Sequence, residues 1–341
     1  MKKLLNTLYV TTQDAYLRKE GETVVVEKDK HVLLRLPIHT LQGIVTFGNV
    51  MTSPFLLNFC AERGVCVSFM SESGKFLARV TGPVSGNVLL RLAQMRAYDD
   101  KEKKGDIARS FVIGKLLNAR NVIMRRIRDH GESPMLRDAA EKHADVIRRV
   151  RDSPPDVERL RGLEGEAASV YFWCFNELLV AQKEAFSIMG RNRRPPTDPM
   201  NALLSYLYTL LAHDCRGALE GVGLDPQIGF LHEVRPGRPC LALDLMEEFR
   251  AIFADRVALS LVNLRQVGPR DFKTTESGAV EMREEARKTV LQTWQKKKQE
   301  TILHPFLEER VPAGLLPHLQ ALLLARHLRK DLDAYPPFII K

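Results

Sequence analysis

The chain has 341 residues, of which 45% are hydrophobic, and a formal net charge of +9 at pH 7. This length can supply a hydrophobic core for each of two domains. The sequence contains no run of about 18 uncharged apolar residues, which argues against a membrane-spanning helix, and its opening residues lack the apolar stretch of a signal peptide. We therefore expect a globular, cytoplasmic protein.

Five cysteines lack both the Cys-x-x-Cys motif and zinc-finger spacing. This indicates reduced core residues rather than disulfides or structural zinc. The excess of Lys and Arg over Asp and Glu lies mostly between residues 86 and 151. Such a segment is either a solvated helical face with ordinary i,i+4 ion pairs or a nucleic-acid surface, and composition leaves both open.

Residues 1–84 predict a small domain built from β-sheet. Gly, Asp and Pro separate short runs rich in Val, Ile, Thr and aromatic residues: LYVTT, TVVVEK, HVLLRLP, GIVTFG and VCVSFM. One helix interrupts them, because Ser53 is a good N-cap, Pro54 suits a first turn and Gly64 suits a C-terminal cap. The segment SESGK predicts a hairpin turn between VCVSFM and FLARVTG.

Residues 85–341 predict a larger, all-α domain. The hydrophobic period changes from 2 to about 3.6 after TGPVSGN. Amphipathic stretches follow at 86–104, 106–129, 135–151, 156–189 and 199–222. Gly- and Pro-rich breakers separate these stretches, as expected of loops between helices.

The segment GFLHEVRPGRPCLALDLMEEFR, residues 229–250, sets His232, Asp244 and Glu247 among apolar residues. Its leucine spacing predicts a helix that begins near residues 238–240, with the two acids at i,i+3 on a shared face. Two carboxylates that close repel each other unless a cation or a proton offsets their charge. A divalent metal ion is one such cation.

The same segment has a simpler interpretation. The two acids could lie on an exposed face, with Arg250 and Arg256 as ion-pair partners. A lone histidine in an apolar stretch is also more often a hydrogen-bonded core residue than a ligand. The residues by themselves leave both interpretations open.

A further acid lies in the apolar and aromatic segment LRGLEGEAASVYFWCFNELL, residues 160–179. The setting predicts a largely buried helix, and a buried carboxylate needs a partner. Arg159 or Arg161 could pair with Glu164. Alternatively, Glu164 meets the histidine and the aspartate of the later segment across the helix bundle.

Three segments carry a resemblance to a known family. The GLEGEAASVYF segment, the GLDPQIGFLH stretch and the LALDLMEEF helix together resemble the CRISPR-associated integrases, the endonucleases of spacer acquisition and the first of the Cas proteins by family name. The resemblance covers the whole chain, and the opening MKKLLNTLYVTTQDAYL is most similar to the I-C subtype. It implies an α+β fold, in which a small β domain that forms the dimer precedes an α-helical catalytic domain.

The resemblance also implies roles for individual residues. Glu164 matches the family's Glu-Gly motif, His232 closes its Gly-Phe-x-His motif, and Asp244 is the first acid of the following helix; these three would bind the metal ion. Glu247 falls where many relatives carry a second Asp, and would be catalytic either as a direct ligand or in support of the ligands. Asn201 would orient groups of the active site.

Carboxylate oxygens and an imidazole suit Mg²⁺ or Mn²⁺. Such an ion would act as a Lewis acid at a phosphodiester. In the implied integrase, the 3′-OH of a short DNA fragment attacks the repeat array, whereas attack by water would make the same site a nuclease. The resemblance further implies double-stranded and branched DNA, a homodimer and the small second Cas protein of the adaptation complex as partners.

DNA also requires cations that contact its phosphates. One candidate cluster precedes a helix capped by Asp198, and another follows Trp294. Their members are Arg191, Arg193, Arg194, Lys296, Lys297 and Lys298.

A protein of another class remains an alternative. In a non-catalytic DNA-binding scaffold, the basic segment would supply affinity and the acids would only form salt bridges. A restriction-like nuclease has less support, because no Asp followed by Glu-x-Lys falls on a strand pair. A transcriptional regulator has less still, because no helix-turn-helix is evident.

Overall fold

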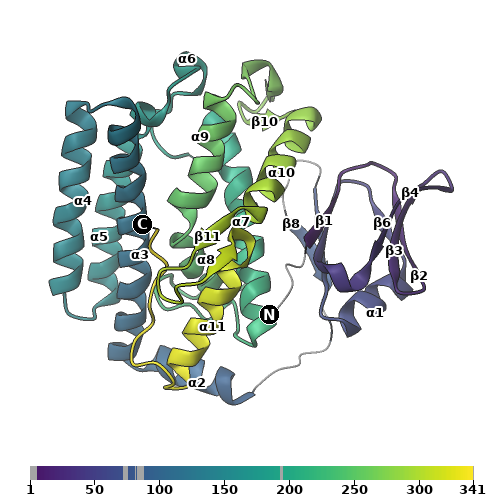
Figure 1. Ribbon diagram of the computed structural model, residues 1–341, viewed down its shortest axis with the longest axis horizontal. Coiled ribbons are helices and arrows are strands. Elements are labelled where there is room, and N and C mark those ends of the chain that lie inside the picture. Colours follow the sequence, from purple (N-terminus) through teal and green to yellow (C-terminus); the bar gives the residue numbers. More distant parts are fainter. Residues whose placement is uncertain (1–5, 72–75, 81, 83–87, 193–194, 341) are drawn as a thin grey trace. The chain divides into compact units, whose positions relative to one another are not determined.

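The computed structural model describes residues 6–71, 76–80, 82, 88–192 and 195–340. Contacts divide the chain into two units, Met1–Gly86 and Asn87–Lys341. The first is built on β-sheet and the second is mostly helical (Figure 1), which confirms the predicted α+β fold class. The predicted boundary after residue 84 falls among residues outside the described ranges.

The first unit contains two four-stranded sheets. One has the spatial order β1 (Asn6–Val10), β5 (Leu41–Phe47), β7 (Cys66–Met70) and β8 (Phe76–Val80). The other has the order β4 (His31–Pro37), β3 (Thr23–Lys28), β2 (Tyr16–Glu20) and β6 (Met51–Thr52). Strands β1, β5 and β7 are parallel, and β8 pairs antiparallel with β7. In the second sheet β4, β3 and β2 pair antiparallel, while β6 is parallel to β2. The 3₁₀ turn η1 (Ile38–Thr40) joins the two sheets.

Helix α1 (Pro54–Glu62) completes the first core. Ser53 caps it by accepting a hydrogen bond from the backbone N of Leu56 at 3.2 Å, as predicted. Leu56 and Phe59 are buried in one cluster with side chains from both sheets. Strand β2 was not predicted, because YLRKE is too polar to show a strand pattern and depends on its pairing with β3. The tip of the predicted hairpin turn, residues 72–75, lies outside the described residues, although the strands beside it pair as expected.

The second unit is built from helices. Those up to residue 222 are α2 (Val88–Asp99), α3 (Lys101–His130), α4 (Pro134–Asp152), α5 (Val157–Trp173), η2 (Phe175–Leu178), α6 (Lys183–Phe186) and α7 (Pro199–Val222). Those that follow are α8 (Cys240–Glu247), the π-helix η3 (Arg250–Asp255), α9 (Arg256–Asn263), η4 (Pro269–Asp271), α10 (Glu284–Gln299), η5 (Ala313–Leu315) and α11 (Leu316–Leu328). Two short antiparallel hairpins, β9–β10 (Phe272–Thr274 and Val280–Met282) and β11–β12 (Thr301–Leu303 and Arg310–Pro312), flank α10.

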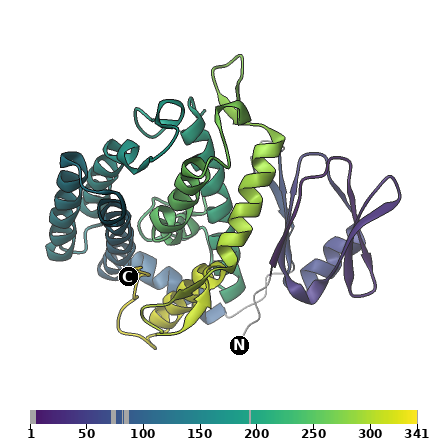
Figure 2. The same cartoon turned by 45° about the horizontal axis from the view of Figure 1, so that its top comes forward.

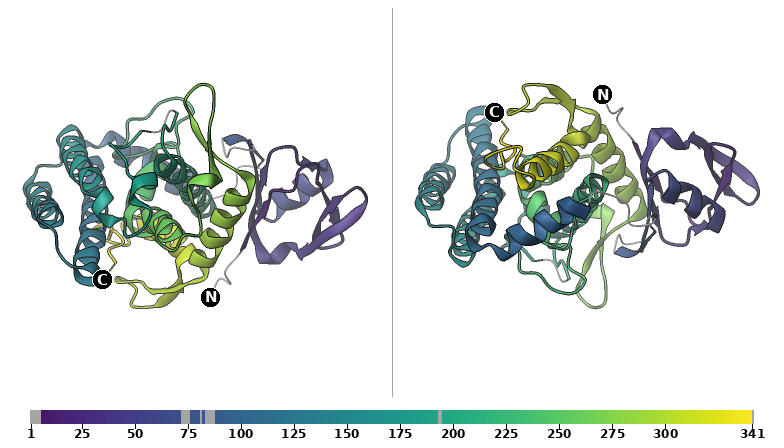
Figure 3. Two further views of the ribbon diagram at one scale, coloured as in Figure 1. Left: turned by 90° about the horizontal axis from the view of Figure 1, so that it is seen from above. Right: turned by 90° about the horizontal axis from the view of Figure 1, so that it is seen from below.

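Two groups of helices frame the interior of this unit. Helices α3, α4 and α5 pack side by side at one edge (Figures 1 and 3). Helix α7 is buried around most of its surface, because it contacts α8, α9, α11 and η3. Helix α10 packs along α9 (Figure 2). The short α8–η3 segment therefore lies between α3 and α7, with which both of its parts are in contact.

Three of the predicted helices have different limits in the structure. The stretches 86–104 and 106–129 were expected to break near residue 105, but the break is at Asp100, whose side chain caps α3 by accepting from Lys103 N. The stretch 156–189 was expected to be continuous, but α5 ends at Trp173. The amide of Asn176 then bonds both the backbone N and the backbone O of Ile188, which folds the segment back on itself.

All five cysteines carry free thiols, and all but Cys66 are buried. Within the described residues, we find no helix with enough uninterrupted apolar sequence to traverse a bilayer.

The segment that follows α11 is bonded to the interior of the second unit. Glu248, which is fully buried, accepts hydrogen bonds from Phe338 N at 2.7 Å, from Gln320 Nε2 at 2.9 Å and from the hydroxyl of Tyr335. Asn118 of α3 donates to the carbonyls of Glu248 and Phe338. These bonds attach the extended tail to α3 and to the end of α8.

Glu248 should make the stability of the protein depend on pH. Burial raises the pKa of Glu248 to about 8, although its hydrogen bonds act in the opposite direction. Because the folded-state pKa lies above that of the unfolded chain, this contribution to stability is present at low pH and is lost as pH rises through about 8. Between pH 6 and pH 9 we expect the melting temperature to fall. The Glu248→Gln variant, measured by differential scanning calorimetry, should show a smaller fall.

The exposed Glu309→Gln variant is the control, and should retain the pH dependence of the parent protein. An equal fall for Glu248→Gln and for the parent would contradict the assignment to Glu248.

Candidate active site

Asp244 is a buried carboxylate surrounded by hydrogen-bond donors. Its Oδ2 accepts from the backbone N of Phe230 at 2.6 Å and of Leu231 at 3.0 Å. Its Oδ1 accepts from the backbone N of His232 at 2.9 Å and from Nδ1 of the same residue at 2.6 Å. These four donors match the roughly four lone-pair positions of a carboxylate. Asp244 therefore fixes the 230–232 loop to α8.

Gly229 allows this loop to approach α8 closely. A Cβ built at position 229 would lie 2.7 Å from the Cβ and the backbone carbon of Cys240, and 2.8 Å from Asp244 Oδ2. Atoms that close would have to shift, and two of the three belong to the start of a helix. A residue without a side chain is thus required where the loop passes Asp244.

Arg161 holds the loop from its other side. Its Nε donates to the carbonyl of Leu231 at 2.8 Å. Arg161 precedes Glu164 by three residues in α5, so this bond connects the α5 turn that carries Glu164 to the loop that carries His232. Arg161 therefore does not serve as the partner of Glu164, which was one of the predicted alternatives.

His232 is oriented by its bond to Asp244. A carboxylate only accepts, so Nδ1 must carry the hydrogen of this bond. The other ring nitrogen, Nε2, faces Glu247 and lies 3.8 Å from its Oε1. Asp244 and Glu247 thus lie on a shared face of α8, as predicted, and both lie beside His232.

Glu247 is the second buried acid of α8, and cations lie on two sides of it. Its Oε1 is 3.1 Å from Arg250 Nη2, and its Oε2 is 2.8 Å from Lys115 Nζ. Burial by itself would raise the pKa of Glu247, but the charges of Arg250 and Lys115 outweigh it and lower the pKa to about 2. Glu247 is therefore ionised throughout the physiological pH range.

Lys115 connects Glu247 to Glu164. Its ammonium also forms an ion pair with Glu164 Oε1, and only 14% of its side chain is exposed. Glu164, near the middle of α5, has a side chain that is 24% exposed. It is therefore half-buried, whereas the sequence predicted a largely buried helix around it. Within the described ranges, no group of three or more His, Cys, Asp and Glu side chains is assembled to hold an ion. The ammonium of Lys115 lies between the two glutamates instead.

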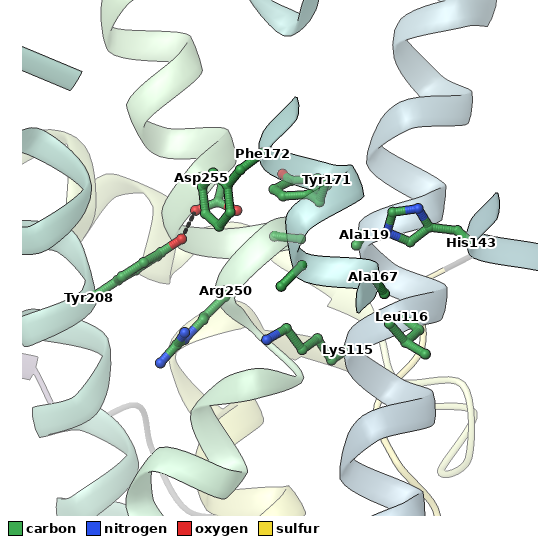
Figure 4. Close-up of a pocket in the computed structure, with 12 residues that line it drawn as sticks. Lys115, Leu116, Ala119, His143, Ala167, Tyr171, Phe172, Tyr208, Arg250 and Asp255 are labelled. Carbon is green, nitrogen blue, oxygen red and sulfur yellow. Dashed lines mark hydrogen bonds between the residues drawn. The ribbon is translucent and has the colours of Figure 1, made fainter. Parts of the chain in front are cut away.

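A small cavity, partly open to solvent, adjoins these charges. Figure 4 shows Lys115 from α3 and Arg250 from η3 on its lining, together with Tyr208 and Asp255. The hydroxyl of Tyr208 donates to Asp255 Oδ1 at 2.6 Å, and burial raises the pKa of Asp255 to about 6. The Arg250 guanidinium lies 5.0 Å from the centre of the Tyr208 ring, within the range of a cation–π contact.

Asn201 acts at a distance from the acids. Its Oδ1 accepts from Arg191 Nη1 at 2.6 Å, and its Nδ2 donates to Gly190 O and to Asp198 Oδ2. The guanidinium of Arg191 in turn lies 5.2 Å from the centre of the Tyr208 ring. Asn201 is thus linked through Arg191 to Tyr208, which lines the cavity.

The predicted DNA-contacting lysines of α10 differ in exposure. Lys298 is buried and lies 2.9 Å from Asp214 Oδ1, so it serves the fold and we remove it from the set of DNA contacts. Lys297 is mostly buried and pairs with Glu300. Lys296 is exposed. The predicted contacts Arg193 and Arg194 lie outside the described residues.

Sequence reasoning missed Lys115, although a signal was present. Lys115 is four residues from both Phe111 and Ala119, which are buried on the inner face of α3. A lysine on the apolar face of a helix needs a buried acidic partner. Arg250, in contrast, was anticipated as an ion-pair partner of the acids. Glu166, which is followed by Ala167 and so does not match the Glu-Gly motif, lies on the surface and pairs with Arg149.

Comparison with known proteins places this chain in a family. Residues 8–296 match the family described as CRISPR associated protein Cas1. A relative from Rhodospirillum rubrum, named CRISPR-associated endonuclease Cas1 2, is 52% identical, and the match covers 100% of each chain.

Solved structures share the fold. A CAS1 protein from Thermotoga maritima is 23% identical with a TM-score of 0.83, and the match covers 97% of this chain and 99% of that one. A chain of a Cas6-RT-Cas1–Cas2 complex is 21% identical with a TM-score of 0.83, over 99% of this chain and 36% of that one.

Substitution of Gly229 should damage the site through the loop. In Gly229→Ala the new methyl group would displace the loop from α8 and weaken the bonds between Asp244 and residues 230–232. We expect a loss of about 1–3 kcal/mol in the free energy of unfolding, measured by urea denaturation. Gly221→Ala is the matched control, because position 221 is a helical glycine with open space around it and alanine favours helix there. Equal stability of the two variants would refute the close-approach argument.

Proposed function

This chain belongs to the Cas1 family, and we propose that it is a metal-dependent DNA endonuclease and integrase that joins short DNA fragments to the repeats of a CRISPR array. The observation that carries the proposal is the constellation at α8. Asp244 orients His232 so that its Nε2 faces Glu247. Lys115 forms ion pairs with both Glu247 and Glu164, and so links Glu164 to this group.

The donor types in this constellation fit a hard divalent cation. We assign Glu164, Glu247 and Nε2 of His232 as the groups that would hold Mg²⁺ or Mn²⁺. When bound, the ion would supply Lewis-acid polarisation of the phosphodiester and offset the charge of the leaving 3′ oxygen.

Asp244 was predicted as a direct ligand, and we assign it a positioning role instead. Four donors already occupy its oxygens, and it is fully buried. By holding the hydrogen on Nδ1 of His232, it leaves Nε2 as the nitrogen that binds or accepts a proton. Glu247, whose role the family motif left open, takes the place of Asp244 in the ligand set.

The remaining groups would handle the nucleic acid. Arg250 balances the charge of Glu247 beside the cavity, and the exposed Lys296 and the Arg191 loop are candidates for phosphate contacts. The attacking group would be the 3′-OH of the fragment in joining, or water in cleavage. In both cases DNA is the substrate.

Partners follow from the family and from one surface. The Cas1–Cas2 complex that shares this fold motivates a complex with the small second Cas protein. The edge strand β4 leaves Val32, Leu33 and Leu34 exposed, with Leu33 at 53%. An apolar edge strand favours association with another chain. We assign it to the homodimer contact of the first unit.

Substitutions in the constellation should separate chemistry from DNA binding. We expect Glu164→Gln, His232→Ala and Glu247→Gln each to reduce joining on supercoiled repeat DNA by at least about 100-fold in Mn²⁺, because each removes a group that would hold the ion. Asp244→Asn should weaken metal affinity by about 10–100-fold through His232. DNA binding, measured by fluorescence anisotropy, should persist in all four variants.

Glu166→Gln is the control, because its carboxylate pairs with Arg149 on the surface. Undiminished joining and cleavage by Glu164→Gln and His232→Ala would contradict the assignment of these residues to the metal ion. Absence of joining and cleavage in the parent protein, with DNA binding retained, would support the non-catalytic DNA-binding scaffold.

Substitution on β4 should test the dimer. Leu33→Lys introduces a charge into the exposed apolar strand, so we expect light scattering after gel filtration to report the monomer mass at micromolar concentration. Leu264→Lys changes an exposed leucine of the second unit, 66% exposed, and should leave the dimer intact. A dimer that persists in Leu33→Lys would exclude β4 from the contact.

A further inference from the structure

Lys115 lies between the two glutamates that we assign to the metal ion. Its Nζ lies 2.8 Å from Glu247 Oε2 and is also paired with Glu164 Oε1. It comes from the middle of α3, whereas the two glutamates come from α8 and α5. One ammonium therefore joins three helices at the site.

We propose that Lys115 is a built-in counter-ion, which holds Glu164 and Glu247 together in the metal-free protein and must leave them for a divalent ion to bind. The inference rests on the proposed function and goes beyond it by assigning a residue that competes with the cofactor. Lys115 is a positioning residue in this scheme.

Charge balance explains why the lysine and the ion exclude each other. In the metal-free site, the positive charges of Lys115 and Arg250 offset the negative charges of Glu164 and Glu247. A divalent ion between the same carboxylates would leave an excess of positive charge in a buried place, where uncompensated charge is costly. Displacement of the ammonium lowers this excess and leaves the two charges of the ion opposite the two carboxylates.

The displaced ammonium has a place to go. Lys115 lines the cavity that Asp255 also lines, as Figure 4 shows. A carboxylate is a favourable neighbour for an ammonium. We expect the side chain to leave the glutamates by rotation toward Asp255, without unfolding of α3.

Competition of this kind sets the apparent affinity for the ion. Part of the binding free energy is used to break two ion pairs, so the intact protein binds the ion less tightly than a variant without the ammonium. The ammonium also prevents repulsion between the glutamates when no ion is present. Removal of Lys115 should therefore tighten metal binding and destabilise the metal-free protein.

The test compares Lys115→Gln, Lys115→Arg and the parent protein. Mn²⁺ binding is measured by electron paramagnetic resonance of the free ion, and melting temperature is measured with chelator and with Mn²⁺. We expect Lys115→Gln to bind Mn²⁺ about tenfold more tightly and to melt several degrees lower in chelator, a loss that Mn²⁺ restores. Lys115→Arg retains the positive charge and should keep affinity near that of the parent. Lys288→Gln, which removes a surface lysine paired with Glu284, is the control and should change neither.

The outcomes distinguish this inference from the proposed function. Equal Mn²⁺ affinity of Lys115→Gln and the parent would overturn the role of Lys115 and leave the metal site standing. Absence of Mn²⁺ binding in both would overturn the metal site and the inference together.

A crystal structure of the parent protein grown with Mn²⁺ keeps the proposal testable should Lys115→Gln fail to fold. We expect Nζ of Lys115 to have left both glutamates. An ion bound while Lys115 still bridges them would contradict the proposal.

Discussion

The saturation of one buried carboxylate determines the geometry of the site. Asp244 accepts four hydrogen bonds from three consecutive residues, and these bonds hold the 230–232 loop against α8. A carboxylate removed from water is costly unless such donors replace its hydration. The bonds that compensate for burial also set the tautomer of His232. Stability of the loop and orientation of the imidazole thus have the same cause.

The second constraint is electrostatic and joins parts of the chain that lie far apart. Glu164, Glu247, Lys115 and Arg250 come from α5, α8, α3 and η3 and form a compact group without net charge. Each member would be unfavourable if buried alone. Their mutual compensation allows ionised acids to remain beside a cavity in the interior of a helical unit. The π-helix η3 contributes by placing Arg250 and Asp255 on the lining of that cavity, and such irregular turns are frequent at functional sites.

Local signals accounted for much of the fold. The cap at Ser53 and the i,i+3 spacing of Asp244 and Glu247 are properties of adjacent residues, so the sequence was sufficient to predict them. Strand β2 was missed because its stability comes from pairing with β3 rather than from its own composition.

The same limit applies to the candidate site, whose residues come together only through tertiary packing. Lys115 and Glu164 are 49 residues apart along the chain, and only the packing of α3 against α5 makes them partners. Family motifs identify the acids and the histidine but do not reveal their hydrogen-bond partners. They therefore could not show that both oxygens of Asp244 already accept two hydrogen bonds each.

The attachment of residues 335–340 to α3 has a practical consequence. Asn118, one turn beyond Lys115, bonds the carbonyl of Phe338 and the backbone N of Ile340, and Pro337 packs within 3.0 Å of the position that a Cβ on Gly114 would take. Residues 335–340 therefore support the part of α3 that carries Lys115. Tags or fluorescent reporters fused directly after residues 335–340 would strain these bonds and, through α3, disturb Lys115, although Asn118 and Phe338 are 220 residues apart in sequence. Insertions are better directed to a loop such as residues 275–279.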